Sequence, residues 1–461
     1  MNRDKATVLG VFSLVLVVIL SIPPLIQWLD DGQINAASPT IKLAGKSSVE
    51  LHGQFRGLWL QVHNNDVNFP FEDYVREIAN TGADTVCLSV AAYQENCSSS
   101  VIFIEQRKIP SPDRLVKLIQ LAKSLNKRVI LMPIVLLEKG RAKEWRGMIN
   151  PEDWASWWQY YTDYILLYAN IAESNGVDLF MVGSELVSTE DQTDKWQGVI
   201  QRVRDQNRRY LDSQFRQHLR EKFPTYKAAD FKEKFSIDNI DSFDYSQTPS
   251  DQITPALTAI YEPFWADRHL LLSYSSNWDH YKVVKFWDSL DAVGMTSYYN
   301  LNPDKQNDPT LESLLAAWQP IKKDIFEWQQ TIGKPVIFTE VGWCSQQGSS
   351  IEPWNYYHST TVNLAEQQRC MDSFLKTFSG EPWVGGILVW KWRDSPEMVG
   401  GEADFGYTPV NKPVMKTIQN YFAMPNPGRL AKDIGKTSTS QPTSAPAVSE
   451  VTTAPVDVAA Q

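Results

Sequence analysis

The sequence predicts a (β/α)8 barrel, and three observations lead to that prediction. The chain has 461 residues, of which 43% are hydrophobic, so it can bury a large core. Between residues 53 and 424, eight short apolar runs alternate with longer amphipathic stretches. Most of these runs are apolar throughout, as parallel strands covered on both faces must be. A doubly wound open sheet is the alternative, but no glycine-rich phosphate loop follows the first run.

The predicted strands follow one another with room for a helix after each. They cover residues 55–61, 84–90, 128–135, 178–185, 269–276, 291–298, 335–341 and 385–392. The helix expected within 111–127 begins with a Ser-Pro-Asp capping sequence, and the helix expected within 151–176 ends in Asn175-Gly176. The segment from about 205 to 262 is too long for an ordinary connection. It predicts a mostly helical insertion after the fourth strand.

The two ends of the chain are not expected to belong to the barrel, which we place at 53–424. Residues 1–30 combine Arg3 and Lys5 with an apolar run from Ala6 to Ile22, the pattern of a signal peptide or signal anchor. Residues 31–52 are predicted to be a linker, and residues 425–461, rich in Ser, Thr, Pro and Ala, a disordered tail. We therefore expect an extracytoplasmic protein that is anchored to a membrane by its N-terminal segment or secreted.

Composition narrows the classes of function. The chain carries 44 basic and 54 acidic residues, a net charge of −10, without a basic patch, which argues against nucleic-acid binding. Its four cysteines form no CxxC pair and no Cys/His cluster, which argues against a zinc site. The 17 tryptophans fit a carbohydrate cleft, in which flat rings stack on sugars, although burial in the core explains any one of them equally well.

Two glutamates end predicted strands. Glu185 ends the fourth strand, and Glu340 ends the seventh, in GKPVIFTEVGW at 333–343. Active sites of such barrels lie at the carboxyl ends of the strands, where the fourth and seventh strands face each other across the mouth. Two carboxyl groups about 5–5.5 Å apart can hydrolyse a glycosidic bond with retention of configuration. We expect Glu185 to be the acid/base and Glu340 the nucleophile, although either one alone could simply cap its strand.

Other residues near these strand ends are candidates for binding a sugar. Tyr298 ends the sixth strand and could hydrogen-bond Glu340, and two tryptophans end the eighth strand and could form the floor of the site. A packing role is an equally good explanation for each of them alone. The candidate substrate-binding residues are Tyr298, Trp390, Trp392, Trp145, Arg146, Ser184 and Trp59.

Several stretches together resemble a known family. GKPVIFTEVGW, VDLFMVGSEL, EWRGMINPEDWASWWQYY, DAVGMTSYYN, GGILVWKW and DFGYTPVNKPVMKTI are similar to glycoside hydrolase family 113, the β-mannanase-like barrels of clan A. The resemblance covers most of residues 53–424. It implies retaining endo-hydrolysis of β-1,4-mannan without a cofactor. It also implies Glu185 as acid/base, Glu340 as nucleophile and Tyr298 beside Glu340, with Ser184 in the place of the asparagine that many clan A enzymes use for the sugar 2-hydroxyl.

Two alternatives remain from the sequence. Met132 and Ile134 stand at the end of the third strand, where the family usually has polar residues. This difference favours the first alternative, in which the barrel binds a glycan but has lost catalysis. The possible membrane anchor motivates a transglycosylase that remodels an envelope polysaccharide.

Overall fold

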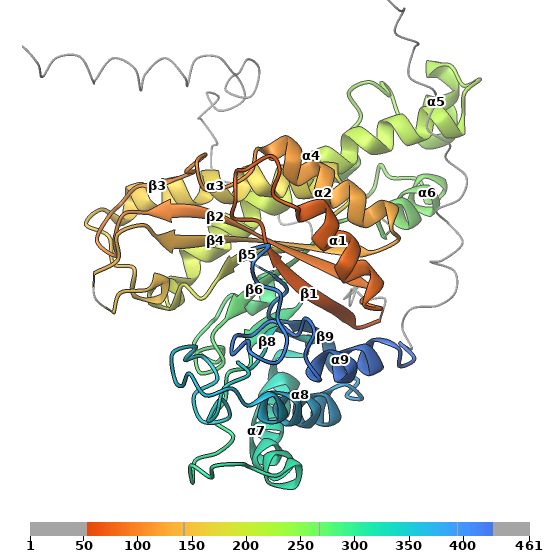
Figure 1. Cartoon of the computed structure of the whole chain (residues 1–461). Coiled ribbons are helices and arrows are strands. Elements are labelled where there is room, and N and C mark those ends of the chain that lie inside the picture. Colours follow the sequence, from red (N-terminus) through yellow and green to blue (C-terminus); the bar gives the residue numbers. More distant parts are fainter. Residues whose placement is uncertain (1–52, 142, 267, 394, 427–461) are drawn as a thin grey trace, which may run out of the picture. The chain divides into compact units, whose positions relative to one another are not determined.

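Parallel strands close into a barrel in the computed structural model, which describes residues 53–141, 143–266, 268–393 and 395–426 (Figure 1). The barrel strands are β1 (Phe55–Gln61), β2 (Thr85–Gln94), β4 (Arg128–Leu137), β5 (Leu179–Ser184), β6 (Leu271–Ser276), β7 (Val293–Thr296), β8 (Val336–Val341) and β9 (Val384–Val389). β1 pairs in parallel with β2 on one side and with β9 on the other, which closes the sheet. The predicted (β/α)8 fold is therefore confirmed.

The predicted segments at the chain ends lie outside the described residues. These are the signal peptide or anchor at 1–30, the linker at 31–52 and all but the first residues of the tail at 425–461. Within the described ranges, no helix combines the length and the hydropathy that crossing a bilayer requires.

Strands β2 and β4 extend further toward the barrel mouth than the sequence indicated. They pair from Thr85 and Arg128 to Gln94 and Leu137, beyond the predicted ends at 90 and 135. A short strand, β3 (Ile102–Phe103), pairs antiparallel with the end of β2. The alanine-rich end of β2 lacks the apolar run of a central strand, so pairing on both sides, rather than propensity, accounts for its extended conformation.

Helices surround the barrel. The helices that follow its strands are α1 (Phe71–Asn80), α2 (Pro112–Ser124), α3 (Trp154–Ser174), α4 (Thr193–Lys222), α7 (Leu311–Ile332), α8 (Leu364–Phe378) and α9 (Val414–Phe422). Their ends follow local capping rules: the Ser111 side chain accepts a hydrogen bond from the Arg114 N–H at the start of α2, and Gly333 ends α7 with a φ of 69°.

Alternation along each strand divides the core into two layers. On β4, Ile130, Met132 and Ile134 belong to the cluster inside the barrel, whereas Val129 and Leu131 belong to the cluster between strands and helices. Because both faces of each strand are buried, the strands are apolar runs without polar alternation, which is why the sequence pattern was readable.

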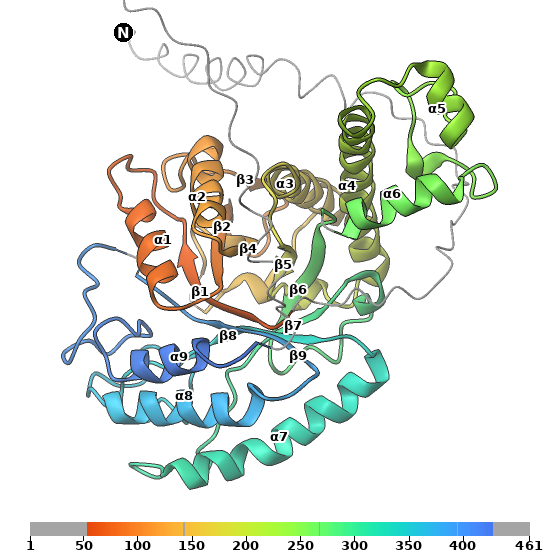
Figure 2. The same ribbon diagram turned by 90° about the vertical axis from the view of Figure 1, so that its right-hand side faces the viewer.

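The chain between β5 and β6 leaves the barrel on a long helix. Arg204 of α4 bonds Leu270 O and the Asp291 carboxylate, just before β6 and β7 begin, and α4 then continues for 18 residues to Lys222. Beyond it, α5 (Ala228–Phe235) and α6 (Pro255–Ala266) pack with α4 around a separate small core. Figures 1 and 2 show α5 and α6 at the end of the barrel opposite the strand arrowheads, so they do not reach the mouth.

Candidate active site

Glu185 directly follows β5 in an uncommon backbone conformation. Its φ is 53°, in the left-handed region that residues other than glycine rarely adopt. The neighbouring strand holds this turn, since Glu185 N–H donates to Ser275 O at 2.8 Å and Leu186 N–H donates to the Tyr274 hydroxyl at 2.9 Å. Backbone conformations of this kind concentrate at functional sites, where the surrounding structure enforces them.

Arg146 comes from the loop after β4 and binds the end of β5. It lies in the 3-10 helix η2 (Arg146–Met148), and its guanidinium forms an ion pair of 2.5 Å with the Glu185 carboxylate. Its Nε also donates to the Ser184 carbonyl oxygen at 3.3 Å. The Ser184 hydroxyl itself is buried and has no hydrogen-bond partner among the described residues.

Glu340 lies near the end of β8, 4% exposed. The Tyr298 hydroxyl donates to its Oε2 at 2.9 Å, as the sequence suggested, while its Oε1 has no partner in the described part of the chain. The Ser297 N–H and hydroxyl both donate to the Glu340 carbonyl oxygen, at 3.0 and 2.9 Å. The backbone of Glu340 is thus fixed, and one of its carboxylate oxygens has no partner among the described residues.

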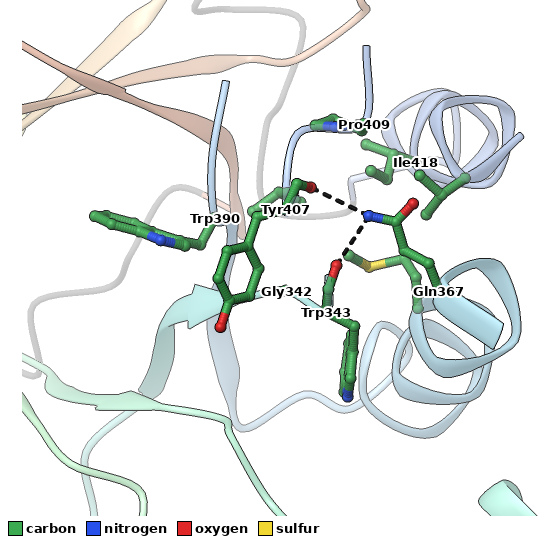
Figure 3. Close-up of a pocket in the computed structure, with 10 residues that line it drawn as sticks. Gly342, Trp343, Gln367, Trp390, Tyr407, Pro409 and Ile418 are labelled. Atoms are coloured by element: carbon green, nitrogen blue, oxygen red, sulfur yellow. Dashed lines mark hydrogen bonds between the residues drawn. The ribbon is translucent and has the colours of Figure 1, made fainter. Parts of the chain in front are cut away.

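The glycine that follows this acid allows β9 to approach β8. A Cβ on Gly342 would lie 2.3 Å from the Trp390 carbonyl oxygen and 3.2 Å from the Tyr407 ring. Figure 3 shows Trp390 and Tyr407 on one side of Gly342, and Gln367 of α8 donating to the carbonyl oxygens of Trp343 and Tyr407, at 2.8 and 3.2 Å. The close packing around Gly342 therefore fixes the backbone of Trp390 and the ring of Tyr407.

Electrostatics couple the two acids. Burial, together with the negative charge of Glu185, raises the pKa of Glu340 to about 8, against the opposing effects of Arg146 and the Tyr298 hydrogen bond. Burial also raises the pKa of Glu185, and the Arg146 cation opposes that rise. The two carboxyl groups are near enough that a charge on one resists ionisation of the other, so they titrate as a pair.

The other predicted residues divide into those near the acids and one that lies elsewhere. Trp59 donates to Thr339 O at 2.6 Å inside the barrel, and its ring centroid lies 6.4 Å from that of the half-buried Trp390. Trp145 is 39% exposed beside Arg146. Trp392 instead packs between strands and helices, where its indole N–H donates to the Glu77 carboxylate of α1 at 2.9 Å.

Three charged or titratable residues near the site were not anticipated. Burial, followed by the charges of Lys391 and Arg146, lowers the pKa of His63 to about 4, so this imidazole is neutral at physiological pH. Lys391, which follows Trp390, also lowers the pKa of Glu340, and Asp279 raises that of Glu185. All three stand within three residues of the end of β1, β9 or β6, so a search of every strand end would have found them.

A third carboxylate lies behind Glu185. Glu190 is fully buried and accepts hydrogen bonds from the Tyr274 hydroxyl at 2.9 Å and the Ser276 hydroxyl at 3.0 Å. Burial raises its pKa to about 7. Because the Tyr274 hydroxyl also accepts from Leu186 N–H, Glu190 orients the tyrosine that holds the turn of Glu185.

The described residues offer no site for a metal and no disulfide. No three His, Cys, Asp or Glu side chains in the described ranges are arranged to ligate an ion. The cysteines Cys87, Cys97, Cys344 and Cys370 are all free and buried.

Comparisons with known proteins agree with the barrel fold. The family model for Glycoside Hydrolase Family 113 matches residues 68–265 and 269–412. The β-mannanase AaManA from Alicyclobacillus acidocaldarius, solved in complex with ManMIm, is 22% identical, with a TM-score of 0.60 over 82% of this chain and 99% of that one. A complex of another family 113 β-1,4-mannanase is also 22% identical, with a TM-score of 0.59 over 80% and 99%. The search of curated proteins returned no match.

Proposed function

The chain belongs to glycoside hydrolase family 113, and we propose that it cleaves β-mannan or a related β-linked polysaccharide by double displacement. One observation carries the mechanism: two buried glutamates lie at the ends of β5 and β8, at the same end of the barrel, one paired with Arg146 and the other bonded by Tyr298. The β-mannanase structures that share its fold support the choice of substrate.

In the first step, the Glu340 carboxylate attacks the anomeric carbon while the glycosidic C–O bond breaks. Glu185 donates its proton to the departing oxygen, and a glycosyl ester of Glu340 results. In the second step, Glu185 accepts a proton from water, the water oxygen attacks the anomeric carbon, and the ester bond to Glu340 breaks. Both steps invert the anomeric carbon, so the product retains the configuration of the substrate.

The surroundings of each acid support its role. Tyr298 donates to Glu340 Oε2 and leaves Oε1 unpaired, which suits a nucleophile that attacks with one oxygen. The unpaired, buried Ser184 hydroxyl stands beside Glu185, where it can bind a sugar hydroxyl. These groups are fixed before substrate arrives, so they lose little entropy on binding it.

The test is hydrolysis of mannohexaose by the full chain and by variants of each acid. Glu340→Ala and Glu185→Ala should each lower kcat at least about 1,000-fold. Azide should separate their roles on an aryl β-mannobioside, whose leaving group departs without a proton from Glu185. It should give an α-glycosyl azide with Glu340→Ala and a β-glycosyl azide with Glu185→Ala. Glu173→Gln is the matched control, since it replaces another buried glutamate, on α3, and should keep full activity.

Other outcomes identify the alternatives. Binding of mannohexaose without release of reducing ends would indicate a glycan-binding barrel, in keeping with the apolar Met132 and Ile134 inside the barrel. Products longer than the donor would indicate a transglycosylase. Full activity in Glu340→Ala would refute the proposed mechanism.

A further inference from the structure

The loop between β8 and α8 exposes three aromatic side chains close together. Trp354 is 45% exposed, Tyr356 53% and Tyr357 83%. Across the described residues, exposed aromatic side chains occur elsewhere only singly, at Trp145, Tyr160, Phe326 and Phe405. Clustered exposed aromatic surface of this kind marks a binding site more often than isolated residues do.

Buried polar residues hold this loop in place. Glu366 of α8, fully buried, accepts from the Ser350 N–H at 3.0 Å and the Ser350 hydroxyl at 2.7 Å. The buried Gln346 amide donates to Tyr356 O at 3.2 Å and accepts from Ser359 N–H at 2.6 Å. The aromatic side chains are therefore exposed from a rigid backbone, which lowers the entropic cost of binding a ligand.

A fourth ring extends the surface toward β6. Trp278 stacks on Trp354 with ring centroids 5.8 Å apart and an interplanar angle of 19°. Two hydrogen bonds fix the backbone of Trp278. Its N–H donates to the Thr296 hydroxyl at 3.1 Å, and its carbonyl oxygen accepts from the Tyr299 hydroxyl at 2.9 Å. We call Trp278, Trp354, Tyr356 and Tyr357 the aromatic platform.

The loop that carries the aromatic platform contacts residues beside Glu340. The Tyr407 hydroxyl donates to Pro353 O, one residue before Trp354, and the Tyr407 ring lies 6.3 Å from the ring of Tyr298. Tyr298 in turn donates to Glu340. Tyr407 therefore connects the backbone next to Trp354 with the tyrosine that bonds the proposed nucleophile.

A second connection leads to the other acid. Asp279 follows Trp278 in the chain, and its charge raises the pKa of Glu185. Trp278 and Trp354 lie on the loops that follow β6 and β8, at the same end of the barrel as both glutamates, where a polysaccharide held for cleavage must pass.

Building on the proposed function, we propose that the aromatic platform binds sugars of a β-linked polysaccharide beyond the bond that is cleaved. The C–H faces of sugar rings fit the electron-rich faces of tryptophan and tyrosine, and sugar hydroxyls can reach the tyrosine hydroxyls and indole N–H groups. Asn355 and His358 neighbour the exposed rings in the chain and help to fix the loop, because both side chains bond the Glu352 carboxylate and Asn355 also accepts from the Tyr357 N–H.

The experiment compares a long and a short substrate in Trp354→Ala and Tyr357→Ala. The ratio of kcat/KM for mannohexaose to kcat/KM for an aryl β-mannobioside should fall about 5- to 30-fold, mainly through KM. The matched controls are Tyr160→Ala on α3 and Phe326→Ala on α7, which remove exposed aromatic side chains of 43% and 41% exposure and should keep the ratio. Thermal unfolding of every variant confirms that it is folded.

A binding measurement separates this proposal from the proposed function. Calorimetry with mannohexaose in a Glu340→Gln background should show weaker binding when Trp354→Ala is added. An unchanged ratio and unchanged affinity would overturn the platform while leaving hydrolysis intact. Conversely, Trp354-dependent affinity in a chain without hydrolytic activity would uphold the platform and refute the mechanism.

Discussion

Arg146 forms an ion pair with Glu185, whereas Glu340, the other acid of the pair, accepts a hydrogen bond from the uncharged Tyr298 hydroxyl. In the empty site this arrangement favours the negative charge on Glu185 and the proton on Glu340. Double displacement needs the reverse distribution when the glycosidic bond breaks. Bound substrate must therefore compete with Arg146 for Glu185, and the arginine should control the protonation of both acids.

Arg146→Gln tests that control. Since the cation lowers the pKa of Glu340 and opposes the rise at Glu185, its loss should raise both. The acidic limb of the kcat/KM profile, which reports ionisation of the nucleophile, should move to higher pH. Arg141→Gln, an exposed arginine in the same loop, serves as control and should keep the profile. An unmoved acidic limb in Arg146→Gln would show that the ion pair has no catalytic influence.

Tyr298→Phe removes the hydrogen bond to the proposed nucleophile. The hydroxyl favours the ionised form of Glu340, so kcat should fall about 10- to 100-fold and the acidic limb should again move to higher pH. Tyr164→Phe is the matched control, because it removes another buried hydroxyl, bonded to Val90 O and Ile134 O. A fall in kcat of equal size in both variants would assign the effect to folding.

Tyr274→Phe tests how the turn at Glu185 is held. The substitution removes the hydroxyl that accepts from the Leu186 N–H and donates to Glu190. The free energy of unfolding, measured by urea denaturation, should fall by about 1–3 kcal/mol. The kcat should fall as well, because Glu185 depends on this turn. Tyr161→Phe removes a hydroxyl bonded to Val182 O and should lower stability alone. Unchanged kcat in Tyr274→Phe would show that Glu185 keeps its backbone conformation without the Tyr274 hydroxyl.

Glu340→Gln should stabilise the protein in a pH-dependent way. The pKa of Glu340 is about 8 in the folded chain and has the ordinary value of 4.5 in the unfolded chain. Between these two pH values the folded state keeps a proton that the unfolded chain releases. The stability linked to this proton is fully present below pH 4.5 and is lost as pH rises through 8. The free energy of unfolding of the variant should therefore exceed that of the natural chain by about 1–2 kcal/mol at pH 8, and by almost nothing at pH 4.5. Thermal unfolding at both pH values measures the difference, and an equal gain at each would contradict it.

Sequence patterns predicted the barrel because each strand is buried on two faces and leaves an apolar run. They also placed Glu185 and Glu340 correctly at the ends of β5 and β8. The alternation of side chains between the two faces of a strand does not continue beyond Val389, where β9 ends. Trp390 and Trp392 were expected on one face, yet Trp392 packs on α1 instead.

The parts of the site that the sequence did not predict come from loops. Arg146 reaches Glu185 because of the path taken by the chain after β4, and Tyr407 reaches Tyr298 because Gln367 and Gly342 fix its backbone and ring. Such contacts depend on side chains far apart in the sequence, so no local period encodes them.

The position of α5 and α6 has a practical consequence. They pack in their own small core beyond the amino ends of the strands, away from the sugar-facing end. A biotin acceptor peptide inserted between these helices would tether the enzyme to a solid support with its catalytic end directed outward. An insoluble polysaccharide could then be presented to every immobilised molecule in a productive orientation.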